Sequence, residues 1–159
     1  MDAMRHRVVD SPLGPLTFVV DDDGAVVRIA MAGQRHLPDA ATFGPRDDTV
    51  AEEAVAQLAE YFAGERTDFD FPAAPRGTEF QRRVWEALAE IPFGETTTYA
   101  TIAKRLGSPT ATRAVGAAIG RNPLLVTAPC HRVVGASGDL TGYAGGLDAK
   151  RWLLAHEQR

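Results

Sequence analysis

The only cysteine of this chain, Cys130, lies in the segment TAPCHRVVGASG, between a proline and the dipeptide His131-Arg132. A lone cysteine is more often a small buried apolar residue than a catalytic one. An imidazole or a cation beside a thiol, however, favours the reactive thiolate, and Pro129 makes the preceding backbone rigid. A purely structural sulfur gains nothing from these neighbours, so we predict that Cys130 is a nucleophile.

A nucleophilic thiol needs a base, and His131 is the nearest candidate. Neighbouring side chains in an extended segment point to opposite sides, so we expect His131 to reach the Cys130 thiol through a water molecule. His131 would in turn need an orienting acceptor, for which Glu157 near the C-terminus is the candidate. Taken alone, Glu157 is more simply interpreted as a solvated charge, although a glutamate at a helix C-terminus is mildly unfavourable.

The composition is that of a soluble globular protein, with 45% hydrophobic and 24% charged residues in 159. No apolar run approaches the roughly 20 residues that a membrane helix needs, and the first ten residues lack the apolar core of a signal peptide. We therefore expect no membrane association and a cytoplasmic location. One cysteine allows no internal disulfide, and the spacing of the histidines is not that of a zinc site. We expect neither a metal nor an organic cofactor.

Charge is distributed unevenly along the chain. Residues 1–77 hold 7 Lys or Arg against 14 Asp or Glu, whereas residues 78–159 hold 10 against 7. No acidic residue occurs from 96 to 138, a stretch that contains Lys104, Arg105, Arg113, Arg121 and Arg132. Such a stretch is suited to a polyanion. It is equally compatible with a solvated face that lacks acids by chance, and charge alone does not decide.

The N-terminal half has the alternating pattern of strands followed by one helix. Residues 8–31 read as strand pieces interrupted at 12–14 and at 22–24, where Asp-Gly between apolar runs predicts a hairpin. Residues 32–48 are predicted to form a loop and TVAEEAVAQLAEYFAGE an amphipathic helix. One side of that helix carries Val50, Ala54, Leu58, Tyr61 and Phe62. We predict an N-terminal subdomain over residues 1–75 and a second domain over 76–159.

The C-terminal half is predicted to be mostly helical. Thr78 and Gln81 fit a capping box at the start of TEFQRRVWEALAEIPFG. The segments TTTYATIAKRLG and SPTATRAVGAAIGRNP predict a helix-turn-helix, whose second helix would start at Ser108 as N-cap with Pro109 in its first turn. Asp148 is the predicted cap of the last helix. Small residues crowd the second helix, either for close approach to a partner or for tight core packing: Ala111, Ala114, Gly116, Ala117, Ala118 and Gly120.

The segment PCHRVVGASGDLTGYAGGLDAKRWLLAHE resembles the active-site region of the O6-alkylguanine-DNA alkyltransferases, also called methylated-DNA–protein-cysteine methyltransferases. FQRRVWEALAEIPFGETTTYATIAKRLG and TRAVGAAIGRNP are similar to the rest of that family's C-terminal domain in order and spacing. The resemblance is close over residues 77–157 and looser over DSPLGPLTFVV and YFAGE. It implies an α+β fold, with a small RNase H-like N-terminal subdomain built on an antiparallel sheet and a mostly helical C-terminal winged helix-turn-helix domain.

The resemblance also implies roles for residues in catalysis. Cys130 would accept the alkyl group, His131 would act as base through a water, and Glu157 would orient His131. Asn122 would be the hinge between the helix-turn-helix and the active-site segment, and Tyr99 would donate a proton to the guanine ring. The substrate pocket would be formed by Tyr99, Pro129, Cys130, Val133, Tyr143, Ala144 and Gly145, with the amide of Ala144 and the carbonyls of Cys130 and Val133 contacting the base.

DNA is the partner that the resemblance implies, bound in the minor groove by the helix-turn-helix. Arg113 would enter the duplex and fill the space left by the flipped base. The other expected DNA-binding residues are Thr110, Ala111, Thr112, Ala114, Gly116, Ala117 and Arg121. The expected substrate is O6-alkylguanine, with O4-alkylthymine as a second candidate. The protein is expected to act once per molecule and as a monomer, with cooperative binding along DNA left open.

Two other hypotheses remain at this point. A winged-helix module could recognise lesions without chemistry, but it would have no use for a reactive thiol. A cysteine hydrolase could use Cys130, His131 and Glu157 as a triad, but adjacent cysteine and histidine have poor geometry for one. The alanine at position 144, where relatives vary, bears on the size of the alkyl group that fits.

Overall fold

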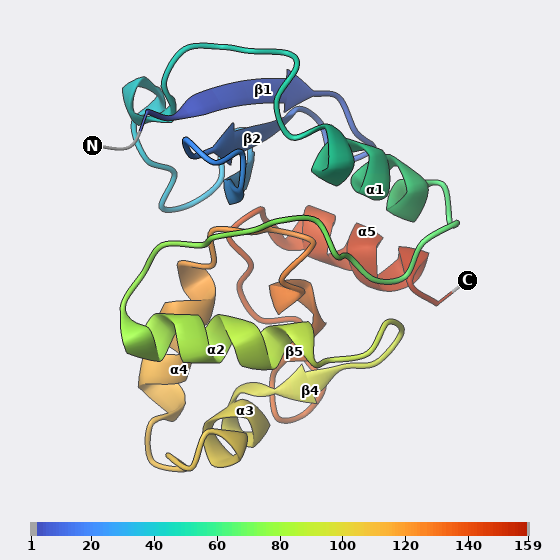
Figure 1. Cartoon of the computed structure of the whole chain (residues 1–159). Coiled ribbons are helices and arrows are strands. Elements are labelled where there is room, and N and C mark those ends of the chain that lie inside the picture. Colours follow the sequence, from blue (N-terminus) through green and yellow to red (C-terminus); the bar gives the residue numbers. More distant parts are fainter. Residues whose placement is uncertain (1–2, 159) are drawn as a thin grey trace.

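Three short strands at the N-terminus form an antiparallel sheet in the order β1-β2-β3 (Figure 1). They are β1 (Arg5–Val9), β2 (Leu16–Val20) and β3 (Val26–Met31). The computed structural model describes residues 3–158 of the chain. The Asp21 carboxylate accepts the amides of Asp23 and Ala25, and Gly24 takes the left-handed conformation (φ 79°) that glycine adopts most easily. The predicted Asp-Gly hairpin is therefore confirmed.

One helix, α1 (Glu52–Phe62), lies beside this sheet and turns one face towards the core (Figure 1). Ala54, Leu58 and Tyr61 are buried on that face, as the pattern predicts, and Phe62 packs at its edge. The preceding segment, predicted as a loop, contains a short 3-10 helix, η1 (Ala40–Phe43). The Asp39 side chain caps it by accepting the amide of Ala41, a local interaction of the kind that starts helical turns.

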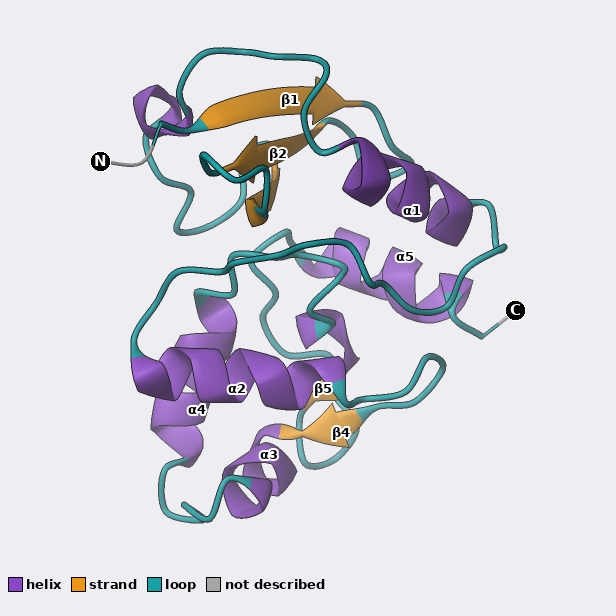
Figure 2. Ribbon diagram, in the orientation of Figure 1, coloured by secondary structure: helices purple, strands orange, loops and turns teal. Residues whose placement is uncertain are grey.

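The C-terminal half is built from helices α2 (Glu79–Ala89), α3 (Tyr99–Arg105), α4 (Thr112–Gly120) and α5 (Leu147–His156) (Figure 2). A 3-10 turn, η2 (Cys130–Arg132), precedes β5 (Val133–Val134), which pairs in parallel with β4 (Thr97–Thr98). At the start of α2, Thr78 and Gln81 exchange side-chain and backbone hydrogen bonds, so the predicted capping box is confirmed. The α+β fold is also as predicted.

The start of α4 differs from the prediction. The helix begins at Thr112 with Ala111 as N-cap, so neither Ser108 nor Pro109 belongs to it. Instead the Ala111 amide donates to the Ser108 carbonyl at 2.8 Å, which closes a tight turn. Pro109 occupies the second position of that turn, where its fixed φ is favourable. The same Ser-Pro pair suits a helix start and a turn, and here the turn connects α3 to α4.

The cap of α5 also differs from the prediction. Gly146, rather than Asp148, is the N-cap residue, and the Lys150 amide donates to the Gly146 carbonyl. Asp148 lies in the first turn and forms an exposed ion pair with Arg151 at 3.0 Å. An acid in the first helical turn still interacts favourably with the helix dipole, which explains its position without a cap.

Two segments from outside the sheet form backbone hydrogen bonds with β3 along the edge that is not paired with β2. Ile29 exchanges backbone hydrogen bonds with Pro123 and Leu125, just before the Cys130 segment. Val26 exchanges two more with Pro72 and Ala74 in the linker between the halves. The N-terminal sheet therefore fixes the approach to Cys130. Within residues 3–158, none of the helices is both long and apolar enough to span a bilayer.

Candidate active site

The chain approaches Cys130 through a strained tight turn. Val126 has a φ of 71°, a region that β-branched residues rarely adopt. The Thr127 amide donates to the Leu125 carbonyl at 2.9 Å across it, which makes a three-residue γ-turn. Val126 is fully buried, so the surrounding packing holds this conformation. Strain of this kind persists where the neighbouring structure determines the backbone.

A second three-residue turn follows at Pro129, whose φ of −79° and ψ of 64° bring the Cys130 amide 2.7 Å from the Ala128 carbonyl. Asn122, just after α4, forms hydrogen bonds with the backbone on either side of the first turn. Its side-chain nitrogen donates to the Ala128 carbonyl at 2.8 Å, and its oxygen accepts the Leu124 amide at 3.0 Å. Asn122 thus joins the helix-turn-helix to the Cys130 segment, the position implied for a hinge.

The Cys130 thiol is buried, with 3% of the residue exposed. Burial raises the pKa of Cys130 to about 11, although a hydrogen bond with Asn122 and the charge of Lys150 oppose this shift. The expectation that the adjacent His131 and Arg132 favour the thiolate is therefore wrong for the resting protein. The physical reason is that Arg132 is ion-paired elsewhere and burial penalises the charged sulfur. The thiol is protonated at neutral pH and needs a base.

His131 and Glu157 lie together, 26 positions apart in the sequence. His131 Nε2 is 2.8 Å from Glu157 Oε2, and both side chains are almost completely buried. The segment at Cys130 is a 3-10 turn and not the extended segment for which opposite side-chain directions were argued. Among the described residues, His131 Nδ1 has no hydrogen-bond partner. The pairing that the sequence suggested for His131 and Glu157 is therefore formed.

Electrostatics sets the protonation of this pair. Burial by itself would raise the pKa of Glu157, but hydrogen bonds from His131 and Arg132 outweigh burial and hold that pKa well below its usual range. Burial lowers the pKa of His131, against the opposing effect of Glu157. A neutral imidazole facing an ionised carboxylate carries its proton on the facing nitrogen, Nε2. Nδ1 then keeps a free lone pair, which is what a general base requires.

Two side chains that the sequence did not identify complete the Glu157 site. Arg132 was assigned to a basic surface, yet it is buried and donates to both Glu157 oxygens, at 2.7 and 2.9 Å, and to the Ile91 carbonyl at 2.6 Å. The hydroxyl of Tyr61, from α1, donates to Glu157 Oε2 at 2.6 Å. Neither contact has a local sequence signal, because each joins residues that are distant along the chain.

A cavity of about 310 Å³ opens beside Cys130. Tyr99, Tyr143 and Ala144 line it as expected, whereas Pro129, Val133 and Gly145 do not. The Tyr99 hydroxyl is 2.7 Å from that of Thr141. The remaining lining residues were not predicted for the pocket: Arg35, Gly116, Ile119, Gly120 and Gly142.

The predicted pocket residues outside this cavity support its wall. The Val133 carbonyl accepts from the buried Lys150 ammonium at 2.7 Å, so one of its lone pairs is already engaged. A side chain at Gly145 would collide with Met31 and with the Tyr143 ring. Gly145 therefore permits the close packing that places Tyr143 against the cavity.

Helix α4 presents two faces, which reconciles the two interpretations of its small residues. Val115, Ala118 and Ile119 are buried against the core. The opposite face is exposed at Arg113, Ala114, Ala117 and Arg121, together with Thr110 before the helix, while Ala111, Thr112 and Gly116 are half-buried. Because Gly116 and Gly120 also line the Cys130 cavity, this face of α4 lies next to the Cys130 thiol.

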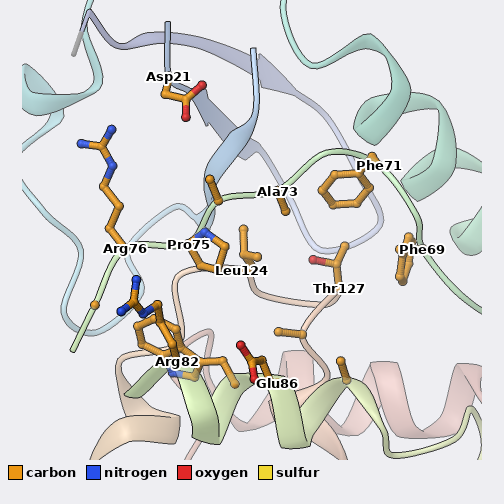
Figure 3. A pocket seen from close by; sticks show the side chains of 15 residues that line it. Asp21, Phe69, Phe71, Ala73, Pro75, Arg76, Arg82, Glu86, Leu124 and Thr127 are labelled. Atoms are coloured by element: carbon orange, nitrogen blue, oxygen red, sulfur yellow. The ribbon is translucent and has the colours of Figure 1, made fainter. Parts of the chain in front are cut away.

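A larger cavity, of about 800 Å³, lies between the linker and α2 (Figure 3). Figure 3 shows Phe69 and Phe71 of the linker on one side and Arg82 and Glu86 of α2 on the other, while the Arg76 side chain points away from α2. None of the residues predicted for the site lines this cavity. The described residues contain no group of three or more His, Cys, Asp or Glu side chains placed to hold a metal ion.

The buried thiol predicts how stability depends on pH. The pKa of Cys130 is about 11 in the folded protein, where burial raises it, against 9.0 in the unfolded chain. Between these values the unfolded chain holds fewer protons, so stability falls as pH rises. We expect a loss of about 1 kcal/mol in the free energy of unfolding between pH 7 and pH 10 from this thiol alone. Urea unfolding at both pH values measures it.

The Cys130→Ser variant is the control for this experiment. It retains Tyr61 and Tyr143, whose pKa values burial also raises, but it lacks the thiol. Wild type should therefore lose more stability than the variant over the same pH range. Identical losses in the two proteins would contradict a buried, protonated Cys130.

The fold and the site define a class: a helix-turn-helix protein that holds a buried cysteine beside the second helix of the motif, α4. Residues 4–75 match the ribonuclease-like domain, and residues 79–159 the DNA-binding domain, of 6-O-methylguanine DNA methyltransferase. The chain belongs to this family.

Similar proteins span almost the whole chain. It is 50% identical, over 98% of its length and 93% of the relative's, to a methylated-DNA–protein-cysteine methyltransferase from Mycolicibacterium paratuberculosis. A relative of the same name from Methanosarcina acetivorans is 48% identical over 97% and 98% of the two chains. The crystal structure of Mycobacterium tuberculosis OGT in complex with DNA is 47% identical, covers 97% of this chain and 92% of its own, and has a TM-score of 0.90.

Proposed function

We propose that this chain is a DNA repair methyltransferase, which takes the alkyl group from O6-alkylguanine in duplex DNA and transfers it to Cys130. The observation that carries the proposal is the position of the thiol. Cys130 lines a cavity next to α4, and His131, the next residue in the chain, is paired with Glu157. Relatives that share about half of its residues are methylated-DNA–protein-cysteine methyltransferases. The direct test is methyl transfer from such a duplex to Cys130.

The proposed reaction is a displacement at saturated carbon. The thiol proton passes through a water to Nδ1 of His131, and the sulfur forms a bond to the alkyl carbon. The bond between that carbon and O6 breaks, and its electron pair stays with the guanine ring, which takes a proton from Tyr99. The proton held by His131 then restores Tyr99 through solvent. The hydroxyl of Thr141 beside Tyr99 can donate to the phenol oxygen and leave the Tyr99 proton free for the base.

The product explains why the protein would act once. A thioether on Cys130 has no ester or imine bond to hydrolyse, and none of the described residues around the cavity supplies a second nucleophile. Each chain would therefore repair one base. O4-alkylthymine is a second candidate substrate, since it offers the same displacement chemistry.

DNA binding in the minor groove is the finer part of the proposal. A base inside a duplex cannot reach a buried thiol, so it must be flipped into the cavity. Ala114 and Ala117 on the exposed face of α4 allow close approach to a narrow groove, and the Arg113 side chain is long enough to fill the vacated stack. This support is geometric. The monomeric state and the cytoplasmic location stay predictions.

Arg113 should matter only when the base must leave a duplex. We expect Arg113→Ala to slow methyl transfer from duplex DNA by about tenfold to a hundredfold, because unstacking a base costs a few kcal/mol. Transfer from the free base O6-methylguanine, which needs no flipping, should be unchanged. Single-turnover assays with the two substrates measure both rates.

Arg121→Ala is the matched control, since Arg121 is a second exposed arginine just after the same helix. If it only contacts phosphate, its loss should weaken DNA affinity and reduce the salt dependence of binding, and leave the transfer rate at saturating DNA near that of wild type. An Arg113→Ala variant equally slow on both substrates would assign Arg113 to the chemistry instead.

A further inference from the structure

The Glu157 carboxylate accepts a hydrogen bond from the N-terminal half of the chain. The Tyr61 hydroxyl, on α1, donates to Oε2 of Glu157 at 2.6 Å across 96 positions of sequence. Figure 1 shows α1 lying beside α5, at whose end Glu157 sits. Tyr61 has no exposed surface. The contact is thus a buried hydrogen bond between the two halves, and it ends on the oxygen that faces His131.

Two further contacts keep Tyr61 in place. Its backbone carbonyl lies 2.7 Å from Nε2 of His156, the residue before Glu157. Its ring packs edge-on against Phe62, Phe93 and His156, with centroids 5.0 to 6.2 Å apart. Because its backbone carbonyl and its ring are both held, Tyr61 has little freedom to move its hydroxyl. Tyr61 therefore offers Glu157 a preorganised donor.

The Tyr61 hydroxyl acts only as a hydrogen-bond donor to Glu157. Burial and the hydrogen bond to Glu157 raise the pKa of Tyr61 far above its usual value, so the phenol stays protonated and donates. Arg132 holds both carboxylate oxygens, whereas Tyr61 binds Oε2 alone. The Tyr61 bond therefore adds an asymmetric restraint, which fixes the rotation of the carboxylate about its bond and hence the direction in which Oε2 accepts from His131.

We propose that Tyr61 is a positioning residue for methyl transfer: its hydroxyl orients the Glu157 carboxylate, so that His131 keeps its proton on Nε2 and its lone pair on Nδ1. This inference rests on the proposed function, because it gives His131 the role of base. It also assigns a part in the chemistry to the N-terminal half. That half lines the Cys130 cavity through Arg35 but supplies neither the nucleophile nor the base.

The test removes the hydroxyl and keeps the ring. In Tyr61→Phe, Arg132 still neutralises Glu157, so the variant should fold. We expect single-turnover methyl transfer to fall about tenfold, a part of what general-base catalysis contributes, with duplex affinity unchanged. The acid limb of the rate–pH profile should move to higher pH, because a carboxylate with one donor fewer attracts the His131 proton more strongly. Nitrogen-15 chemical shifts of the His131 ring should show the doubly protonated ring, which has no lone pair on Nδ1, persisting to higher pH than in wild type.

Phe62→Leu is the matched control, since Phe62 is the next residue on α1, packs on the Tyr61 and Trp152 rings, and has no hydroxyl to donate to Glu157. It should lower the melting temperature and leave the pH profile and the protonation of the His131 ring as in wild type. If Tyr61→Phe lowers only the melting temperature, with the transfer rate, the pH profile and the protonation of His131 unchanged, Tyr61 is merely structural and the inference is wrong. If wild type itself transfers no methyl group, it is the proposed function that fails.

Discussion

The protein is expected to gain the mass of one methylene group, and no more, when it is mixed with excess duplex carrying a single O6-methylguanine. The gain should map to the peptide that contains Cys130, since Cys130 is the only thiol of the chain and it lines the cavity next to α4. The Cys130→Ser variant should gain none, because a serine hydroxyl is a far weaker nucleophile at neutral pH. Intact-mass spectrometry over a titration measures both the gain and its stoichiometry.

The same experiment separates the competing hypotheses. Cys130→Ser should bind the duplex with wild-type affinity, since the thiol is buried and the residues expected to contact DNA lie on the exposed face of α4. Wild type that binds the duplex and gains no mass would be a lesion-binding module with a structural cysteine. Repeated turnover on an ester or peptide would instead indicate a cysteine hydrolase.

Removing the negative charge of Glu157 is expected to have the largest combined effect on stability and rate. Glu157→Gln leaves the Arg132 guanidinium buried without its counter-ion, which should cost about 3–5 kcal/mol of unfolding free energy. It also replaces the carboxylate facing His131 with a neutral amide, which is a weaker acceptor and no longer stabilises a positive charge on the ring, so transfer should slow by about 10²- to 10⁴-fold. Urea unfolding and single-turnover kinetics measure the two losses separately.

A double variant tells these two losses apart. In Glu157→Gln with Arg132→Met, the unpaired cation is also removed, and a buried ion pair replaced by apolar groups is often close to neutral in stability. We expect the double variant to recover part of the lost stability, with the Ile91 carbonyl still missing its donor, and none of the lost rate. Recovery of the rate along with the stability would show that Glu157 serves folding and not the chemistry.

The local part of the site was predictable, and the reason is chemical. Asn122, Pro129, Cys130 and His131 lie within ten residues of sequence, so the connectivity of the chain alone keeps them near one another. The capping box at Thr78 and the Asp-Gly hairpin were likewise predicted correctly, because each is closed by hydrogen bonds between residues two to four apart. The helix start predicted at Ser108 and Pro109 was wrong because serine and proline favour both turns and helix starts.

The charged and aromatic side chains were less predictable. Arg132 belonged by sequence to an acid-free basic stretch, yet folding buries it against an acid 25 positions away. Tyr61 matched the apolar face of a helix, and its pattern gave no sign that its hydroxyl would reach Glu157. Both assignments depend on which helix packs on which, and hydrophobic periodicity records only that a face is buried.

The sequence by itself therefore identified the candidate cysteine, the neighbouring histidine, the helix-turn-helix and the family, because these reside in short contiguous segments. Only the tertiary structure decided the protonation of the site. Burial raises the pKa of Cys130 to about 11, against the expectation from its neighbours. Long-range packing brings the Tyr61 hydroxyl and the Arg132 guanidinium to the Glu157 carboxylate. Desolvation and long-range hydrogen bonds arise only when distant segments meet, so residue order alone does not reveal them.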